Sequence, residues 1–210
     1  NHEFNASIRA VRDNLRRLKS WADVNPSLEG LYQNIRTSFD HLDGYLGLFT
    51  PLHRRLYRKA IIFKGADIHT FLSDLFRERF KRHEVQLAGT PAFMQTKIEG
   101  YPSSFYPVFV NLVDNAVFWL KDQLVRIITL DALPSGELIV RDTGPGIPLR
   151  DRESVFALGF SRKPGGRGMG LHISREVLRK IGYDLELRPS ENGAEFHIMP
   201  PTREKDEVAE

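Results

Sequence analysis

The strongest constraint in this chain is a pair of glycine-rich segments that follow an asparagine-containing, helix-forming stretch. The first segment reads DTGPG at residues 142–146 and the second reads GRGMG at residues 166–170, directly before Leu171. Glycine lets a backbone approach a flat ring or a phosphate closely, because no Cβ is in the way. Free N–H groups at the start of a helix suit phosphate oxygens. The pair of segments therefore predicts a nucleotide pocket.

Single residues in these segments have matching chemistry. Asp142 can accept a hydrogen bond from an exocyclic amine such as that of adenine, with Gly144 and Gly146 beside it. Asn111 and Asn115 are spaced i and i+4, so both amides project from one face of a helix. One of these amides can offer a neutral oxygen to Mg²⁺, and we assign that role to Asn115.

The order of the motifs resembles the N, G1, F and G2 boxes of the GHKL ATP-binding fold, which histidine kinases share with type II topoisomerases. The asparagine helix, a strand ending in Asp142, the aromatic segment at residues 155–160 and the second glycine loop follow one another over about residues 65–200. The resemblance implies ATP and Mg²⁺ as ligands. It also implies further nucleotide contacts, which are Phe156, Gly166, Gly168, Gly170 and Leu171.

Basic residues next to the second glycine loop suit a polyphosphate. Arg162, Lys163 and Arg167 fall inside or beside that loop, and we interpret them as ligand-facing. Family members often carry a lysine three residues after the second asparagine, where this chain has Phe118. A phosphate contact missing there can come from Lys121, Arg162 or Lys163.

The first part of the chain carries two heptad-like apolar stripes that predict an antiparallel helical hairpin. A break at residues 25–27 separates them, with Ser27 as the expected N-cap, and Pro51 is expected to end the second helix. Such a hairpin has little core, so we expect a homodimeric four-helix bundle. The stripes are Phe4, Ile8, Val11, Leu15 and Leu18, followed by Leu28, Leu31, Ile35, Phe39, Leu42, Leu46 and Phe49.

The amino-terminal run HEFN at residues 2–5 resembles the H box of sensor histidine kinases. The resemblance implies that His2 accepts the γ-phosphoryl group of ATP, with Glu3 as base or orienting group, and that a response-regulator receiver domain then takes it. The family commonly has Thr or Asn where this chain has Ala6, a place associated with dephosphorylating the partner. The sequence therefore does not predict phosphatase activity.

The element pattern predicts an α+β chain in three parts. Residues 1–62 are the dimerisation and histidine phosphotransfer hairpin, residues 63–201 are a two-layer α/β sandwich with a mixed sheet, and residues 202–210 are a polar tail. In the sandwich we expect helices at 68–81, 102–121 and 171–181. Strands are expected at 85–87, 125–130, 137–141, 183–188 and 194–199.

Composition narrows the remaining function classes. The 210 residues include no cysteine, which excludes disulfides, thiolate metal sites and cysteine nucleophiles. The net charge of +3 does not indicate nucleic acid. The apolar runs are too short to cross a bilayer, so we expect a cytoplasmic, soluble piece of a larger sensor, with any membrane attachment through other segments.

Two alternatives to a histidine kinase stay open. One is a GHKL ATPase of the topoisomerase type, which carries a glutamate where this chain has Asn111. The other is a regulatory module that binds ATP and signals by conformation, without phosphotransfer.

Overall fold

The computed structural model describes residues 2–25, 27–33, 35, 60–164, 166 and 168–201, which fall into two compact units, residues 1–57 and 58–210. The division at residue 62 stays a prediction. Pro51, residues 36–49 and the polar tail from residue 202 lie outside the described residues. Within the described ranges, no helix is long and apolar enough to span a membrane.

The first unit contains helix α1 (His2–Ala22) and a following helical stretch at residues 27–33 and 35. The side chain of Asn25 caps the second stretch by accepting a hydrogen bond from the backbone N–H of Ser27 at 3.1 Å, so Asn25 takes the capping role expected of Ser27. Leu15, Ala22 and Tyr32 form a small buried cluster. The other described members of the two stripes are exposed, namely Val11, Leu18, Leu28, Leu31 and Ile35.

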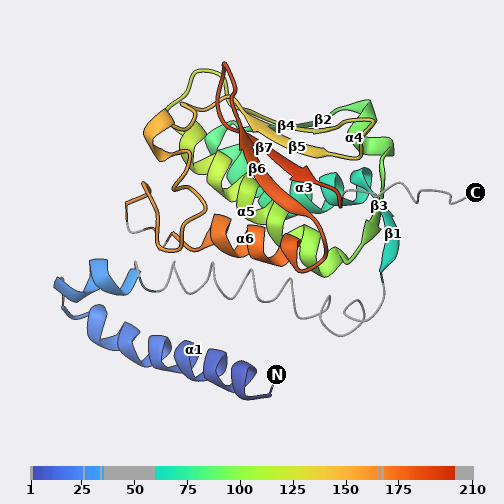
Figure 1. Ribbon diagram of the computed structural model, residues 1–210. Helices are drawn as coiled ribbons and strands as arrows, with labels where there is room; N and C mark the ends of the chain where they lie inside the picture. Colours follow the sequence, from blue (N-terminus) through green and yellow to red (C-terminus); the bar gives the residue numbers. More distant parts are fainter. Residues whose placement is uncertain are drawn as a thin grey trace, which may run out of the picture. The chain divides into compact units, whose positions relative to one another are not determined.

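The second unit is built on a five-stranded mixed sheet with the order β2-β4-β5-β7-β6 (Figure 1). Only β2 and β4 run parallel, and the other neighbours are antiparallel. The strands are β2 (Gln86–Gly89), β4 (Ile127–Ala132), β5 (Leu138–Asp142), β6 (Asp184–Arg188) and β7 (Glu195–Met199).

Three helices pack on one face of this sheet (Figure 1): α3 (Gly65–His83), α5 (Pro102–Leu120) and α6 (Gly170–Arg179). Helix α5 is mostly apolar and starts at a proline, which needs no N–H partner in the first turn. Its inner side forms the centre of the core, where Phe105, Phe109, Leu112 and Leu120 are almost fully buried. Helices on a mixed sheet confirm the predicted α+β sandwich.

Several short elements complete the second unit. Strands β1 (Ile61–Lys64) and β3 (Lys97–Gly100) form a separate antiparallel ribbon, and α4 (Pro91–Gln95) lies between β2 and β3 in sequence. A short 3-10 helix, η1 (Leu149–Asp151), follows the first glycine segment. The helix-starting Gly65 is tightly enclosed, because a Cβ there would lie 1.9 Å from the carbonyl oxygen of Phe93.

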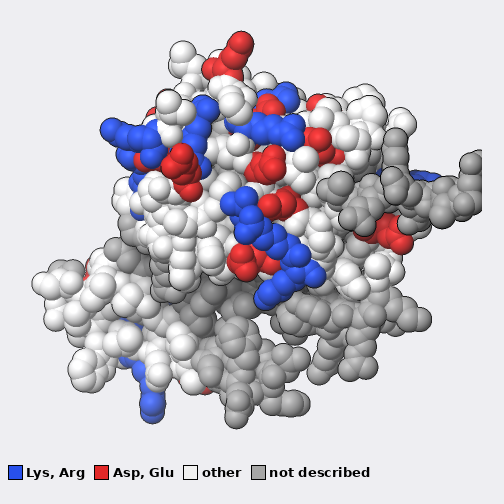
Figure 2. Space-filling view, viewed as in Figure 1, with Lys and Arg blue, Asp and Glu red and all other residues white. Residues whose placement is uncertain are grey.

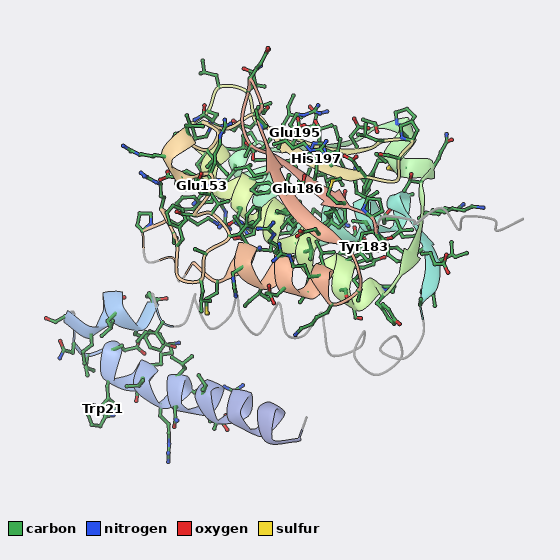
Figure 3. All side chains as sticks on the ribbon, in the orientation of Figure 1. Trp21, Glu153, Tyr183, Glu186, Glu195 and His197 are labelled. Atoms are coloured by element: carbon green, nitrogen blue, oxygen red, sulfur yellow. The ribbon has the colours of Figure 1, made fainter. Side chains whose placement is uncertain are left out.

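Charged side chains cover the opposite face of the sheet, and Figure 2 shows Lys and Arg interspersed with Asp and Glu there. At its centre is the buried His197 of β7, labelled beside Glu195 in Figure 3. Its Nδ1 lies 3.0 Å from Glu137 Oε2 and its Nε2 lies 2.8 Å from Glu195 Oε1. On the same face Arg141 pairs with Glu195 and Arg188 pairs with Glu137. This face is therefore internally paired.

Candidate functional site

Helix α5 presents one polar face formed by Asn111, Asp114 and Asn115, spaced i, i+3 and i+4. Phe118, at i+7, lies at the end of this face. Asn111 Nδ2 donates a hydrogen bond to Ser174 Oγ of α6 at 3.0 Å. A Cβ at Gly170 would lie 2.3 Å from Asn111 Oδ1. Only glycine therefore lets the start of α6 lie this close to the asparagine. Asn115 is half-buried on the same face, next to Asp114.

Asp142 ends β5 and is buried, with a side chain that organises the following loop. Its Oδ1 accepts hydrogen bonds from the N–H groups of Gly144 at 2.8 Å and Ala194 at 3.2 Å. Burial raises the pKa of this carboxyl, while the two backbone hydrogen bonds lower it, and the net shift is upward. The second oxygen, Oδ2, receives no hydrogen bond from the described residues, which suits an exocyclic amine donor.

The loop after Asp142 depends on glycine at two places. Gly146 has φ +72°, a left-handed conformation that side chains disfavour. A Cβ at Gly193 would lie 1.8 Å from the backbone oxygen of Asp142, so the β6–β7 turn also needs a bare backbone here. Gly144 thus lies beside the Asp142 carboxylate, and Gly146 lies against Gly193. A nucleotide contact by either glycine stays a prediction.

Trp119 is a candidate site residue that the sequence did not predict. It directly follows Phe118 on α5 and is 37% exposed, and a Cβ at Gly144 would lie 3.7 Å from Trp119 Cβ. An exposed indole beside a bare loop backbone can stack on a flat ring. The sequence feature that could have indicated Trp119 is its place one helical turn after Asn115, which puts an aromatic ring near the predicted site.

Phe156 is held between α6 and the sheet. Its ring makes an edge contact with Phe196 of β7 at 6.4 Å, and the guanidinium of Arg175 lies 4.7 Å from its centroid. His172 Nδ1 lies 3.0 Å from the backbone oxygen of Phe156. These contacts anchor the segment between the two glycine loops. A nucleotide contact by Phe156 stays a prediction.

The cations predicted to bind phosphate do not share one location in the structure. Lys163 Nζ donates to Asp114 Oδ2 at 3.3 Å, which brings it to the polar face of α5. Arg162 instead donates to Asp151 Oδ1 of η1 at 2.7 Å. Arg167 lies outside the described residues.

The second glycine loop packs against the aromatic segment. Gly168 has φ +64°, and its carbonyl accepts a hydrogen bond from the N–H of Gly159 at 3.0 Å. A Cβ at Gly168 would lie 2.3 Å from the carbonyl carbon of Gly159, so this contact requires glycine. Gly166 N–H donates to the backbone oxygen of Lys163 at 2.9 Å, and Leu171 lies in the first turn of α6.

The two predicted catalytic residues begin the first unit. His2 and Glu3 form the start of α1, and their side chains lie outside what the structure describes. Their predicted roles therefore rest on the sequence.

Comparison with known proteins agrees with this arrangement. Residues 1–58 match the HEF_HK domain, and residues 100–204 match the family model for histidine kinase-, DNA gyrase B- and HSP90-like ATPases. The C4-dicarboxylate transport sensor protein DctB of Rhizobium meliloti is 27% identical over 209 residues, covering 94% of this chain and 32% of its own length. The histidine-protein kinase/phosphatase MprB of a Mycobacterium species is 27% identical over 220 residues, covering 96% of this chain and 42% of its own.

Solved structures give the same fold. The catalytic domain of histidine kinase ThkA superposes with a TM-score of 0.60 at 23% identity, over 68% of this chain and 95% of that domain. The chain spans well under half the length of the two sensor proteins it matches. With half of its residues in the ATPase match and the site motifs in their expected order, the chain belongs to the family of histidine kinase-, DNA gyrase B- and HSP90-like ATPases.

Proposed function

We propose that this chain is the ATP-dependent protein-histidine kinase core of a two-component signalling system. It phosphorylates His2 and passes the phosphoryl group to an aspartate of a response-regulator receiver domain. The observation that carries the proposal is the contact of Asn111 on α5 with the start of α6, in the unit that also holds the Asp142 loop. The HEF_HK match over residues 1–58 adds to it. The cytoplasmic location and the receiver partner belong to the same proposal.

Three described residues of the site have a binding task under this proposal. Asp142 accepts a hydrogen bond from the adenine amine through Oδ2, since Oδ1 already accepts hydrogen bonds from the N–H groups of Gly144 and Ala194. Asn115 offers its amide oxygen to Mg²⁺. The metal ion, when bound, neutralises charge on the phosphate oxygens. Lys163 supplies positive charge from the other side of α5's polar face.

Phosphoryl transfer then depends mainly on how the reacting groups are positioned. A ring nitrogen of His2 attacks the γ-phosphorus, the N–P bond forms, and the bond from phosphorus to the bridging oxygen breaks as ADP leaves. Glu3 takes or holds the proton of the other ring nitrogen. In the second step an aspartate oxygen of the receiver displaces the histidine nitrogen, so the phosphoryl group moves and His2 is restored.

The exposed apolar stripes of the first unit support a homodimer. Val11, Leu18 and Leu31 are about half exposed within one chain, at 43%, 49% and 57%. A second hairpin would cover them in a four-helix bundle.

Incubation with Mg-ATP labelled at the γ-phosphate separates the three functions. The kinase acquires protein-bound label that is acid-labile and base-stable, and His2→Gln loses the label while keeping its ATP affinity. A regulatory module binds ATP and stays unlabelled, and an ATPase releases labelled phosphate. The ATPase is the weaker alternative, because Asn111 is a neutral amide already bonded to Ser174 and provides no base to activate water. ATP binding with neither His2 label nor phosphate release refutes the kinase.

A further inference from the structure

Phe118 replaces the lysine that the family often has, and the structure gathers two lysines around its ring. Lys163 Nζ lies 4.9 Å from the ring centroid and Lys121 Nζ lies 5.1 Å from it. Ammonium groups at this distance are attracted by the ring face. Phe118 therefore acts as a platform that keeps positive charge at the end of α5's polar face, although it carries none itself.

One carboxylate holds the more buried of these lysines. Asp114 accepts from Lys163 Nζ through Oδ2 at 3.3 Å and from Arg79 Nη1 through Oδ1 at 2.6 Å. Asp114 lies between Asn111 and Asn115 in sequence and shares their face of the helix. The Lys163 pair joins residues 49 apart in the sequence, so it also fixes the segment before the second glycine loop onto α5.

Among the described residues, three cations gather around Asp114 and the neighbouring Phe118 ring. They are Arg79, Lys121 and Lys163. The field reaches His83 of α3, whose pKa is lowered by desolvation and then by Lys121 and Arg79. Desolvation likewise lowers the pKa of Lys163, and Asp114 partly offsets this effect. A further anion at this place is therefore electrostatically favoured.

We propose that Lys163 contacts a phosphate group of the nucleotide. The Asp114 carboxylate of the same chain competes with that phosphate group for the Lys163 ammonium. The proposal rests on the proposed ATP site and adds a residue that sets its affinity for phosphates. Lys163 has a flexible four-carbon stem, so its ammonium can leave Asp114 without moving α5. Asp114 keeps Arg79 as a partner when Lys163 leaves, so no buried carboxylate is left unpaired. A phosphate oxygen then takes the place of the Asp114 oxygen at Lys163.

The competition predicts opposite effects of two neutralising substitutions, measured by calorimetry on the full chain with Mg-ATP and with adenosine. Lys163→Met weakens Mg-ATP binding by about tenfold or more, the size of a lost charge-assisted hydrogen bond. Asp114→Asn frees Lys163 and tightens Mg-ATP binding by about three- to tenfold, the size of a removed partly exposed ion pair. Adenosine, which has no phosphate, binds all variants alike.

Double variants and matched controls isolate the pair. In the Lys163→Met background, Asp114→Asn brings no gain. In the Lys121→Met background, which removes a cation from the same ring, the gain persists. Arg79→Met also breaks an ion pair of Asp114 but leaves Lys163 held, so it does not tighten Mg-ATP binding. Circular dichroism melting curves check that each variant is folded.

Two outcomes overturn the proposal while leaving the ATP site standing. One is an Asp114→Asn variant that is folded and binds Mg-ATP no more tightly than the wild type. The other is an equal gain with and without Lys163. A wild-type chain that binds no Mg-ATP refutes both this competition and the proposed function.

Discussion

At the scale of single residues, the Asp142 carboxyl illustrates the balance between ligand binding and stability. Its pKa is raised by burial, despite the hydrogen bonds from Gly144 and Ala194. With a raised pKa the folded chain takes up a proton more readily than the unfolded chain. Stability therefore falls as the pH rises from the unfolded pKa through the folded pKa. At neutral pH the ionised group costs stability, which is consistent with a role in binding.

Replacing Asp142 with Asn is predicted to weaken ATP binding by about tenfold to a hundredfold or more, without lowering the melting temperature at pH 7. The amide keeps an Oδ1 that can accept from Gly144 and Ala194, but it presents an N–H group to the adenine amine. The lost interaction is worth roughly 1–3 kcal/mol or more. Calorimetry measures the affinity and scanning calorimetry the stability. Unchanged ATP affinity would remove Asp142 from the pocket.

Asn115→Ala is predicted to weaken Mg-ATP binding by about tenfold or more while leaving adenosine binding nearly unchanged, because a metal–oxygen contact serves only the phosphates. Titrations of both ligands, with and without Mg²⁺, make the comparison. Equal losses for the two ligands would assign Asn115 a structural role.

The sequence predicts site residues whose chemistry shows in a local motif, and it misses those defined by distant contacts. The positions of Asp142 and the glycines follow from short motifs with a known backbone requirement. The pairing of Lys163 with Asp114 depends on how a loop folds back across 49 residues. The place of Trp119 beside Gly144 likewise depends on how α5 packs against the end of β5.

At the scale of elements, Asp184 ties α6 to the edge of the sheet. It begins β6 and accepts hydrogen bonds from Arg175 Nε at 2.9 Å and Arg179 Nε at 3.1 Å. Desolvation raises the pKa of Asp184, but hydrogen bonds from the two arginines and the Leu185 N–H outweigh it and lower the pKa to about 2. The tether steadies the helix that carries Gly170 and Ser174.

Asp184→Asn is predicted to lower the melting temperature of the second unit by roughly 2–4 °C at pH 7. A lowered folded pKa contributes stability that is complete above the unfolded value of 3.8 and is lost as the pH falls through about 2. The difference between variant and wild type should therefore shrink as the pH drops from 4 toward 2. Urea unfolding across this range measures it, and a pH-independent difference would argue against the tether.

Long periodic elements are predictable here, and short ones only in part. The helix at 102–121 and the strands at 137–141 and 183–188 agree with α5, β5 and β6 to within a few residues. Among the four-residue strands, β2 is expected, at 85–87, but β1 and β3 are not, because so short a strand shows little period. Their pairing, Ile61 with Gly100, joins distant parts of the chain.

At the scale of the whole molecule, the chain is predicted to be a dimer through its first unit. Light scattering at micromolar concentration should give a dimeric mass for residues 1–210 and a monomeric mass for residues 58–210, and both should bind ATP. The shorter chain must keep residues 61–64, because β1 pairs with β3 in the second unit. A monomeric mass for the full chain would contradict the dimer.

Mapping the phosphoryl group shows directly whether ATP bound by the second unit phosphorylates the histidine that begins the first unit. The chain is incubated with Mg-ATP and digested under alkaline conditions for mass spectrometry. We expect one phosphorylated residue, His2, in the wild type, none in His2→Gln, and a strongly reduced amount in Asp142→Asn. A wild-type chain that binds Mg-ATP tightly but never carries phosphate on His2 would contradict the proposed function.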